Sequence, residues 1–157
     1  MKSTLRIVCI LMIFPWLLWG CGVGKRPFLM VQVCVRNSQG MNQLLDELHS
    51  LAASGHMRFS DNGAEAAREL PNLGYRGHER EDGSPAINAV VIRADGMGVG
   101  ASNLGLPGYW VGFGFSEGVN PAEAQHFADE VVRWLGQRWH VEALSAGSPS
   151  YPKVECK

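Results

Sequence analysis

The order of hydrophobic patterns along the chain predicts an α+β fold, a two-layer sandwich in which two helices cover one face of a mainly antiparallel sheet. Short valine-rich or alternating stretches, typical of strands, occur at five places. Two longer stretches repeat apolar residues at spacings of three and four, as amphipathic helices do, and each lies between strands. This order predicts a ferredoxin-like arrangement with an added strand.

The first strand and helix are predicted at residues 28–35 and 38–55. The strand is rich in valine and predicted to be central in the sheet. Asn37 or Ser38 can cap the helix, and Gly55 can end it. The apolar face of this helix consists of Met41, Leu44, Leu45, Leu48, Leu51 and Ala52.

Shorter elements are predicted to follow before a loop. Residues 57–60 have the pattern of a short strand, and residues 61–70 suit about two helical turns with Asp61 as the cap and Pro71 as the end. Residues 72–85 are rich in glycine and charge and are predicted to form a loop.

Two strands are predicted on either side of a glycine-rich connection. Residues 87–94 have the pattern of a buried strand, residues 96–108 that of the connection, and residues 109–115 that of a second strand. Gly112 and Gly114 occupy one face of the second strand, so another backbone or a packed helix is expected to approach there.

The clearest helix signal begins at Asn120. Asn120 suits the cap, Pro121 the first helical position, and Glu123 a capping-box-like start. A last strand is predicted at residues 140–144, before a tail rich in proline, glycine and serine. The apolar stripe of the helix consists of Ala124, Phe127, Ala128, Val131, Trp134 and Leu135.

The amino terminus resembles the signals of bacterial lipoproteins. Lys2 and Arg6 precede an apolar run at residues 7–19, a layout typical of a secretory signal. Leu18, Gly20 and Cys21 match the lipobox, whose last residue receives the lipid, whereas Trp19 departs from its usual second residue. Two alternatives stay open: an ordinary apolar helix with an unmodified Cys21, or a simple secretory signal cleaved elsewhere.

The lipoprotein resemblance implies a domain organisation and a location. Residues 1–20 would be removed as a signal peptide, residues 21–27 would form a lipidated tether, and residues 28–157 would fold as one domain. Members kept in the inner membrane commonly carry Asp after the cysteine, so Gly22 favours the outer membrane, with the domain in the periplasm. Because the six residues after Cys21 reach only about 20 Å, the domain is expected to work at the membrane surface.

The same resemblance leaves two cysteines for a disulfide. Cys9 would leave with the signal and Cys21 would take the lipid, so Cys34 and Cys156 are expected to pair in an oxidising compartment. In the chain-entropy model such a bridge stabilises by about 4–5 kcal/mol. A redox or metal role for the pair is the alternative, but no second pair stands at metal-ligand spacing.

Charge argues against a nucleic-acid partner. Loss of Lys2 and Arg6 with the signal leaves twelve basic and fifteen acidic residues, a formal charge of −3. A nucleotide is not expected either: the motif at residues 96–101 matches a dinucleotide fingerprint, but residues 102–108 cannot continue as the helix that this fingerprint needs. No cofactor is therefore predicted.

No catalytic or metal site is predicted. Ser102 lacks the glycine two positions after it that a nucleophile elbow needs, and the five histidines show no metal-binding spacing. Carboxylate pairs for sugar chemistry, Asp61 with Glu65 or Asp95 with Glu117, can be written down. A cap for Asp61 and a turn role for Asp95 explain these residues more simply.

The glycine-rich segment is the predicted surface for a protein partner, although a plain connector is the other interpretation. Functional loops are often of this kind, and aromatic residues dominate binding hot spots. The predicted partner-binding residues are Met97, Leu104, Leu106, Tyr109 and Trp110.

The sequence thus favours a lipid-anchored envelope protein that binds another protein rather than an enzyme. By analogy it resembles the small lipoprotein immunity proteins that neutralise envelope-directed toxins. The alternative is a structural or assembly lipoprotein of an envelope machine, and a cell-wall or lipid hydrolase is a third, weaker hypothesis.

Overall fold

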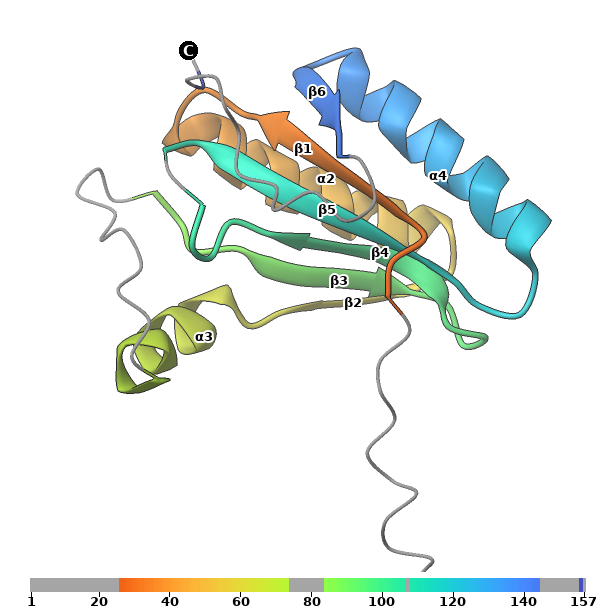
Figure 1. Cartoon of the computed structure of the whole chain (residues 1–157), viewed down its shortest axis with the longest axis horizontal. Helices are drawn as coiled ribbons and strands as arrows, with labels where there is room; N and C mark the ends of the chain where they lie inside the picture. The colour runs from red at the N-terminus through yellow and green to blue at the C-terminus, as the bar shows by residue number, and fades with distance from the viewer. Residues whose placement is uncertain (1–25, 74–83, 107, 145–155, 157) are drawn as a thin grey trace, which may run out of the picture.

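A six-stranded antiparallel sheet forms the centre of the molecule (Figure 1). The computed structural model describes residues 26–73, 84–106, 108–144 and 156. The strands lie in the order β2-β3-β4-β5-β1-β6. Their bounds are β1 Leu29–Cys34, β2 Arg58–Asp61, β3 Asn88–Ile92, β4 Met97–Ser102, β5 Trp110–Glu117 and β6 His140–Ala143.

Four of these strands have the ferredoxin-like order. In β4-β5-β1-β6, the helix α2 (Ser38–Ser54) lies in the connection that leads from β1 toward β4, and α4 (Pro121–Gly136) joins β5 to β6. The strands β2 and β3 extend the sheet beyond β4. The predicted α+β sandwich is confirmed, and it carries two added strands rather than one.

The additional strand is β4, in the segment predicted to be a connection. Residues 97–102 pair with both β3 and β5, and Gly96, with φ of 89°, makes the turn from β3. The prediction of a connection over residues 96–108 was wrong because glycine weakens the local strand pattern, whereas pairing on both sides supplies the stabilisation.

The predicted helix caps are confirmed. The Asn37 side chain accepts a hydrogen bond from the Gly40 N–H at 2.8 Å, and Asn120 accepts one from Glu123 N–H at 3.3 Å. Gly55 follows the last turn of α2 as its C-cap. These bonds satisfy backbone donors that have no partner inside the first helical turn.

A short helix follows β2. The α3 helix (Gly63–Glu69) starts where the Asp61 carboxylate accepts hydrogen bonds from the backbone N–H groups of Gly63 and Asn88, at 3.0 and 3.1 Å. Pro71 does not end the helical conformation outright, because a 3₁₀ turn (Leu70–Leu73) continues it.

The hydrophobic core lies between the sheet and the helices α2 and α4. In Figure 1, α2 passes behind the strands and α4 lies on the β6 side of the sheet. The contacts of α2 are with β2 and β3, and those of α4 are mainly with β5 and β6. Buried side chains of β1, β3, β4 and β5 on this face meet the apolar stripes of the two helices. The largest buried side chains of this core are Phe113 and Phe115 from β5 and Met41, Leu44 and Leu48 from α2.

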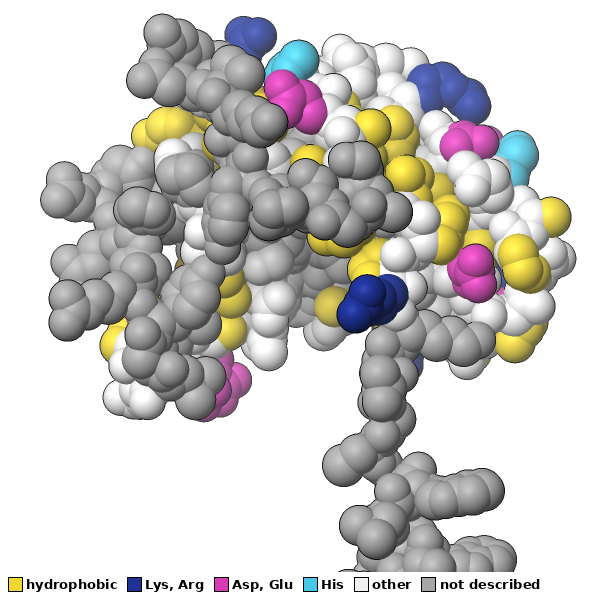
Figure 2. All heavy atoms as spheres, viewed as in Figure 1, with side chains coloured by type: hydrophobic (Ala, Val, Ile, Leu, Met, Phe, Trp, Pro, Cys, Tyr) yellow, Lys and Arg dark blue, Asp and Glu magenta, His cyan; other side chains and the backbone are white. Residues whose placement is uncertain are grey.

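The opposite face of the sheet is not covered by these helices. Figure 2 views it and shows hydrophobic side chains near its middle, with the charged side chains mostly toward the rim. Met30 and Val90 on this face are 42% and 37% exposed. A shallow depression of about 400 Å³ lies here.

The glycines of β5 face this side, where the chain segment at Pro27, rather than a helix, approaches closely. A Cβ at Gly114 would lie 3.0 Å from the Pro27 ring, and one at Gly112 would lie 3.6 Å from both the Leu106 side chain and the Ser102 carbonyl oxygen. The missing Cβ atoms therefore make room for Leu106 and for Pro27, which belongs to the segment that leads into β1.

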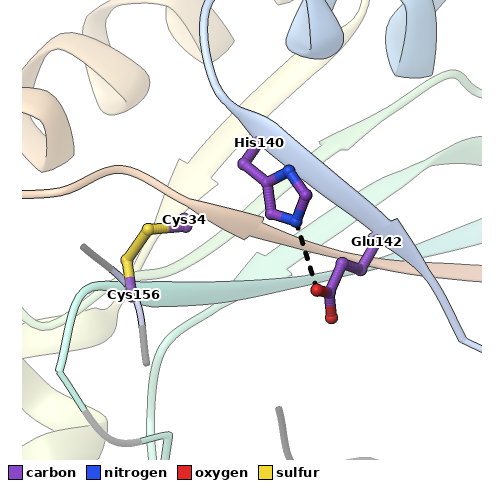
Figure 3. The surroundings of a disulfide bond; sticks show 4 residues. All are labelled: Cys34, His140, Glu142 and Cys156. Atoms are coloured by element: carbon purple, nitrogen blue, oxygen red, sulfur yellow. Dashed lines mark hydrogen bonds and ion pairs between the residues drawn. A yellow bond between two sulfur atoms is a disulfide. The ribbon is translucent and has the colours of Figure 1, made fainter. Parts of the chain in front are cut away.

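Cys34 and Cys156 form the predicted disulfide (Figure 3). The Cα atoms are 5.3 Å apart and the residues are separated by 122 positions. Cys34 pairs with Trp110 of β5 on one side and with His140 of β6 on the other. The bridge therefore ties the carboxyl end of the chain to the middle of the β5-β1-β6 group.

Candidate protein-docking groove

Two of the five predicted partner-binding residues are buried. Met97 is 5% exposed and packs on the helical side of β4, and Trp110 is 2% exposed beside the disulfide. The prediction that these side chains form an exposed surface was wrong, because pairing of β4 and β5 into the sheet turns both into packed positions.

The other three predicted residues are half-buried and do not form one patch. Leu104 and Leu106 line the depression on the open face of the sheet. Tyr109 packs against the core, and its carbonyl accepts a hydrogen bond from the Val35 N–H at 3.0 Å. These three side chains remain predictions for binding.

Two of the four carboxylates considered for catalysis, Asp61 and Asp95, have structural partners. Asp61 binds two backbone N–H groups at the start of α3, and Asp95 accepts from the Met97 N–H at 3.1 Å, so the expected cap and turn roles are confirmed. Within the described residues, no group of three histidine, cysteine or acidic side chains is placed to hold a metal ion.

Charged side chains join the β3–β4 turn to the start of α4. The Arg93 guanidinium binds both the Asp95 and the Glu123 carboxylates. The hydrogen bond from Arg93, and to a smaller extent the one from the Met97 N–H, lowers the pKa of Asp95 from its ordinary 3.8 to about 2. The hydrogen bond from Arg93 also lowers the pKa of Glu123.

A groove of about 460 Å³ runs between α2 and α4 on the helical side. It exists because the two helices stand over different parts of the sheet, α2 on β2 and β3 and α4 mainly on β5, β1 and β6. We call this feature the interhelical groove. It is lined by Glu47, Ser50, Leu51, Ser54, Phe127, Glu130, Val131 and Trp134.

The walls of the interhelical groove differ in character. The α2 wall presents Glu47, Ser50, Leu51 and Ser54, at spacings of three and four that place them along one flank of the helix. The α4 wall is built on two aromatic side chains that remain partly exposed, Phe127 and Trp134. One wall is therefore mainly polar with small side chains, and the other is mainly apolar.

One end of the interhelical groove is closed by Arg138. Its Nε lies 3.2 Å from the Glu47 carboxylate, and its guanidinium carbon lies 5.4 Å from the centre of the Trp134 ring. Trp134 also meets Trp139 edge-on, with ring centres 6.2 Å apart. The Arg138 guanidinium is thus held between the Glu47 carboxylate and the face of the Trp134 indole ring.

The other end of the groove lies toward the start of β1. Rings of Phe28, Phe115 and Phe127 form a continuous series, each pair with centres 6.5 Å apart. Phe28 directly follows Pro27, where the amino-terminal segment reaches the sheet. The Phe127 end of the groove is therefore the end nearest to the predicted tether.

The groove was not recognised in the sequence as a surface. Leu51, Phe127, Val131 and Trp134 were predicted as core residues of amphipathic helices, and this holds fully only for Val131, which is 3% exposed. A usable signal is the width of the α4 stripe: its buried residues are Ala124, Ala128, Val131 and Leu135, and Phe127 and Trp134 widen the stripe and stay partly exposed.

Comparison with known proteins gives no relative for this chain: no protein-family model, curated protein or solved structure matches it. No helix in the described part of the chain has the length and apolar character needed to cross a bilayer. The predicted lipid site at Cys21 and the predicted signal peptide lie outside the described residues.

Proposed function

We propose that the chain is a lipid-anchored protein of the bacterial envelope that binds another protein in the interhelical groove. The groove carries this proposal, since it combines an apolar wall, two partly exposed aromatic side chains and a polar rim. Aromatic side chains in a concave, partly desolvated setting are the usual anchors of protein interfaces. The lipobox-like residues at the amino terminus support the anchor.

The tether fits this role. Pro27 packs on Gly114, so the free part of the tether ends there and can span only the short distance from Cys21. The Phe127 end of the groove would then point toward the bilayer. A partner at or in the membrane would meet the groove without a large displacement of the domain.

We propose two biological roles for such binding. Neutralising an envelope-directed toxin, as immunity lipoproteins do, and holding a component of an envelope assembly both require a docking surface without catalysis. The identity of the bound protein separates them.

Filling the interhelical groove tests the proposal. Ser50 is an exposed residue of the α2 wall, so Ser50→Trp places a large ring in the groove without disturbing the core. We expect the tagged, full-length lipoprotein to recover its partner from envelope membranes about tenfold less well after this change.

Asn42→Trp is the matched control, because Asn42 is exposed on the opposite flank of the same helix. It should leave recovery and the thermal unfolding temperature unchanged. Equal recovery of the same protein by wild type and both variants would show that the interhelical groove is not the docking site.

A further inference from the structure

The shape and charge of the interhelical groove indicate the kind of element that it binds. Resting on the proposed function, we infer that the partner docks through an amphipathic helix with lysine or arginine along one flank.

The groove is walled by two helical stripes of equal length. Glu47 to Ser54 on α2 and Phe127 to Trp134 on α4 each span seven helical steps of about 1.5 Å, or about 10 Å. A third helix lying along such walls can place residues at i, i+4 and i+7 against them, the pattern of helix-in-groove recognition.

The two walls of the groove would contact different flanks of the bound helix. Phe127 and Trp134 offer apolar surface, whereas Glu47 and Ser50 offer hydrogen-bond acceptors. A helix that is apolar on one flank and cationic on the adjacent flank satisfies both walls at once.

The contacts of Arg138 indicate that the groove binds cationic side chains. Its guanidinium lies between Glu47 and the Trp134 ring, a position that a cationic side chain of the partner would compete for. The side chain of Glu130 is 56% exposed at the rim, with His126 Nδ1 3.6 Å from its carboxylate.

Charge on the helices favours a cationic partner. The groove lining contains two acidic side chains, Glu47 and Glu130, and no lysine or arginine. Glu47 already pairs with Arg138 at one end. A cationic segment would therefore be attracted by Glu130, and by Glu47 where it replaces Arg138, whereas an anionic segment would be repelled at these points.

The test uses the exported chain with Cys21→Ser, which keeps every described residue and removes the acyl chains that a cationic peptide would also bind. Two fluorescein-labelled peptides of about 18 residues serve as probes, one of leucine and lysine in a helical pattern and one with glutamate in place of lysine. Fluorescence anisotropy gives both affinities.

We expect the leucine–lysine peptide to bind at least about tenfold more tightly than the leucine–glutamate peptide. Glu47→Gln combined with Glu130→Gln should weaken its binding about tenfold, whereas Glu65→Gln with Glu69→Gln on α3, the same loss of charge, should not. Arg138→Gln should tighten binding about threefold, because it removes the internal competitor for Glu47 and Trp134.

Two results would contradict different parts of this inference. If the glutamate peptide binds as tightly and Ser50→Trp abolishes that binding, the groove docks helices and the inferred charge is wrong. If Ser50→Trp leaves lysine-peptide binding unchanged, the helix inference fails, while the recovery of the partner from membranes still tests the proposed function.

Discussion

Single residues fix the corner where the β3–β4 turn meets the first turn of α4. Arg93 binds the carboxylates of Asp95 and Glu123, and Asp95 also accepts from the backbone of the turn. Glu123 in turn lies in the first turn of α4, where a negative charge interacts favourably with the helix dipole. This corner therefore links the hairpin that extends the sheet to the helix that forms the apolar wall of the interhelical groove.

Stability in acid should depend on this corner. The pKa values of Asp95 and Glu123 are lowered in the folded state, so their stabilisation is complete above the ordinary pKa near 4 and is lost as the pH falls toward about 2. We expect Arg93→Gln to lower the urea midpoint at pH 6, and the difference from wild type to shrink between about pH 4 and pH 2.

Arg133→Gln, a loss of the same charge on α4, serves as the control and should not show this pH dependence. A difference between Arg93→Gln and wild type that stays constant from pH 6 to pH 2 would contradict the assignment.

The sequence predicted the roles of residues that depend on their near neighbours in the chain, but not the roles that depend on distant residues. Asn37, Asn120 and Asp61 were predicted correctly as caps because a cap depends on the next two or three residues. The burial of Met97 and Trp110 was not predicted, because it depends on strand partners that are distant in the sequence, Glu117 for Met97 and Cys34 for Trp110.

At the scale of elements, the sequence predicted helices well and one strand not at all. The α2 and α4 stripes have clear periodicity, and the valine-rich β1 lies between β5 and β6 as expected for an interior strand. The strand β4 contains Gly98 and Gly100, which carry no side-chain pattern. Its place in the sheet comes from its two neighbours, and this information is not local.

The seating of α2 against β1 depends on Gly40. A Cβ at this position would overlap the carbonyl oxygen of Val35, a backbone atom that cannot rotate away. We therefore expect Gly40→Ala to destabilise the fold by about 1–3 kcal/mol, measured by urea unfolding.

Gly136, at the end of α4, is the matched control. A Cβ there would meet only the Val141 side chain, at 4.0 Å, so Gly136→Ala should stabilise by about 0.5–1 kcal/mol through helix propensity. Equal effects of the two substitutions would show that the approach of Val35 does not restrict Gly40.

At the scale of the whole molecule, the termini and the groove are arranged around β1. Pro27 enters at one end of the strand, and the disulfide at Cys34 fixes the carboxyl end of the chain at the other. The bridge closes a long loop and should stabilise the fold by about 4–5 kcal/mol in the chain-entropy model. The interhelical groove lies on the opposite side of the sheet from the disulfide, so it is framed by α2 and α4 alone.

The sequence predicted the two-layer architecture but not this groove, for a physical reason. Periodicity tells which side of each helix is apolar, whereas the groove depends on how far apart the sheet holds the helices. The contacts of α2 with β2 and β3, which lie beyond β4, are not recorded in either helix's periodicity.

Docking of a protein partner between α2 and α4 can be tested by site-specific photocrosslinking in cells. A photoreactive amino acid is placed at Ser50, Ser54 or Asn42 of the full-length lipoprotein. We expect one discrete adduct from Ser50 and from Ser54 and none from Asn42. An adduct of the same protein from Asn42 with none from Ser50 or Ser54 would contradict docking between the two helices.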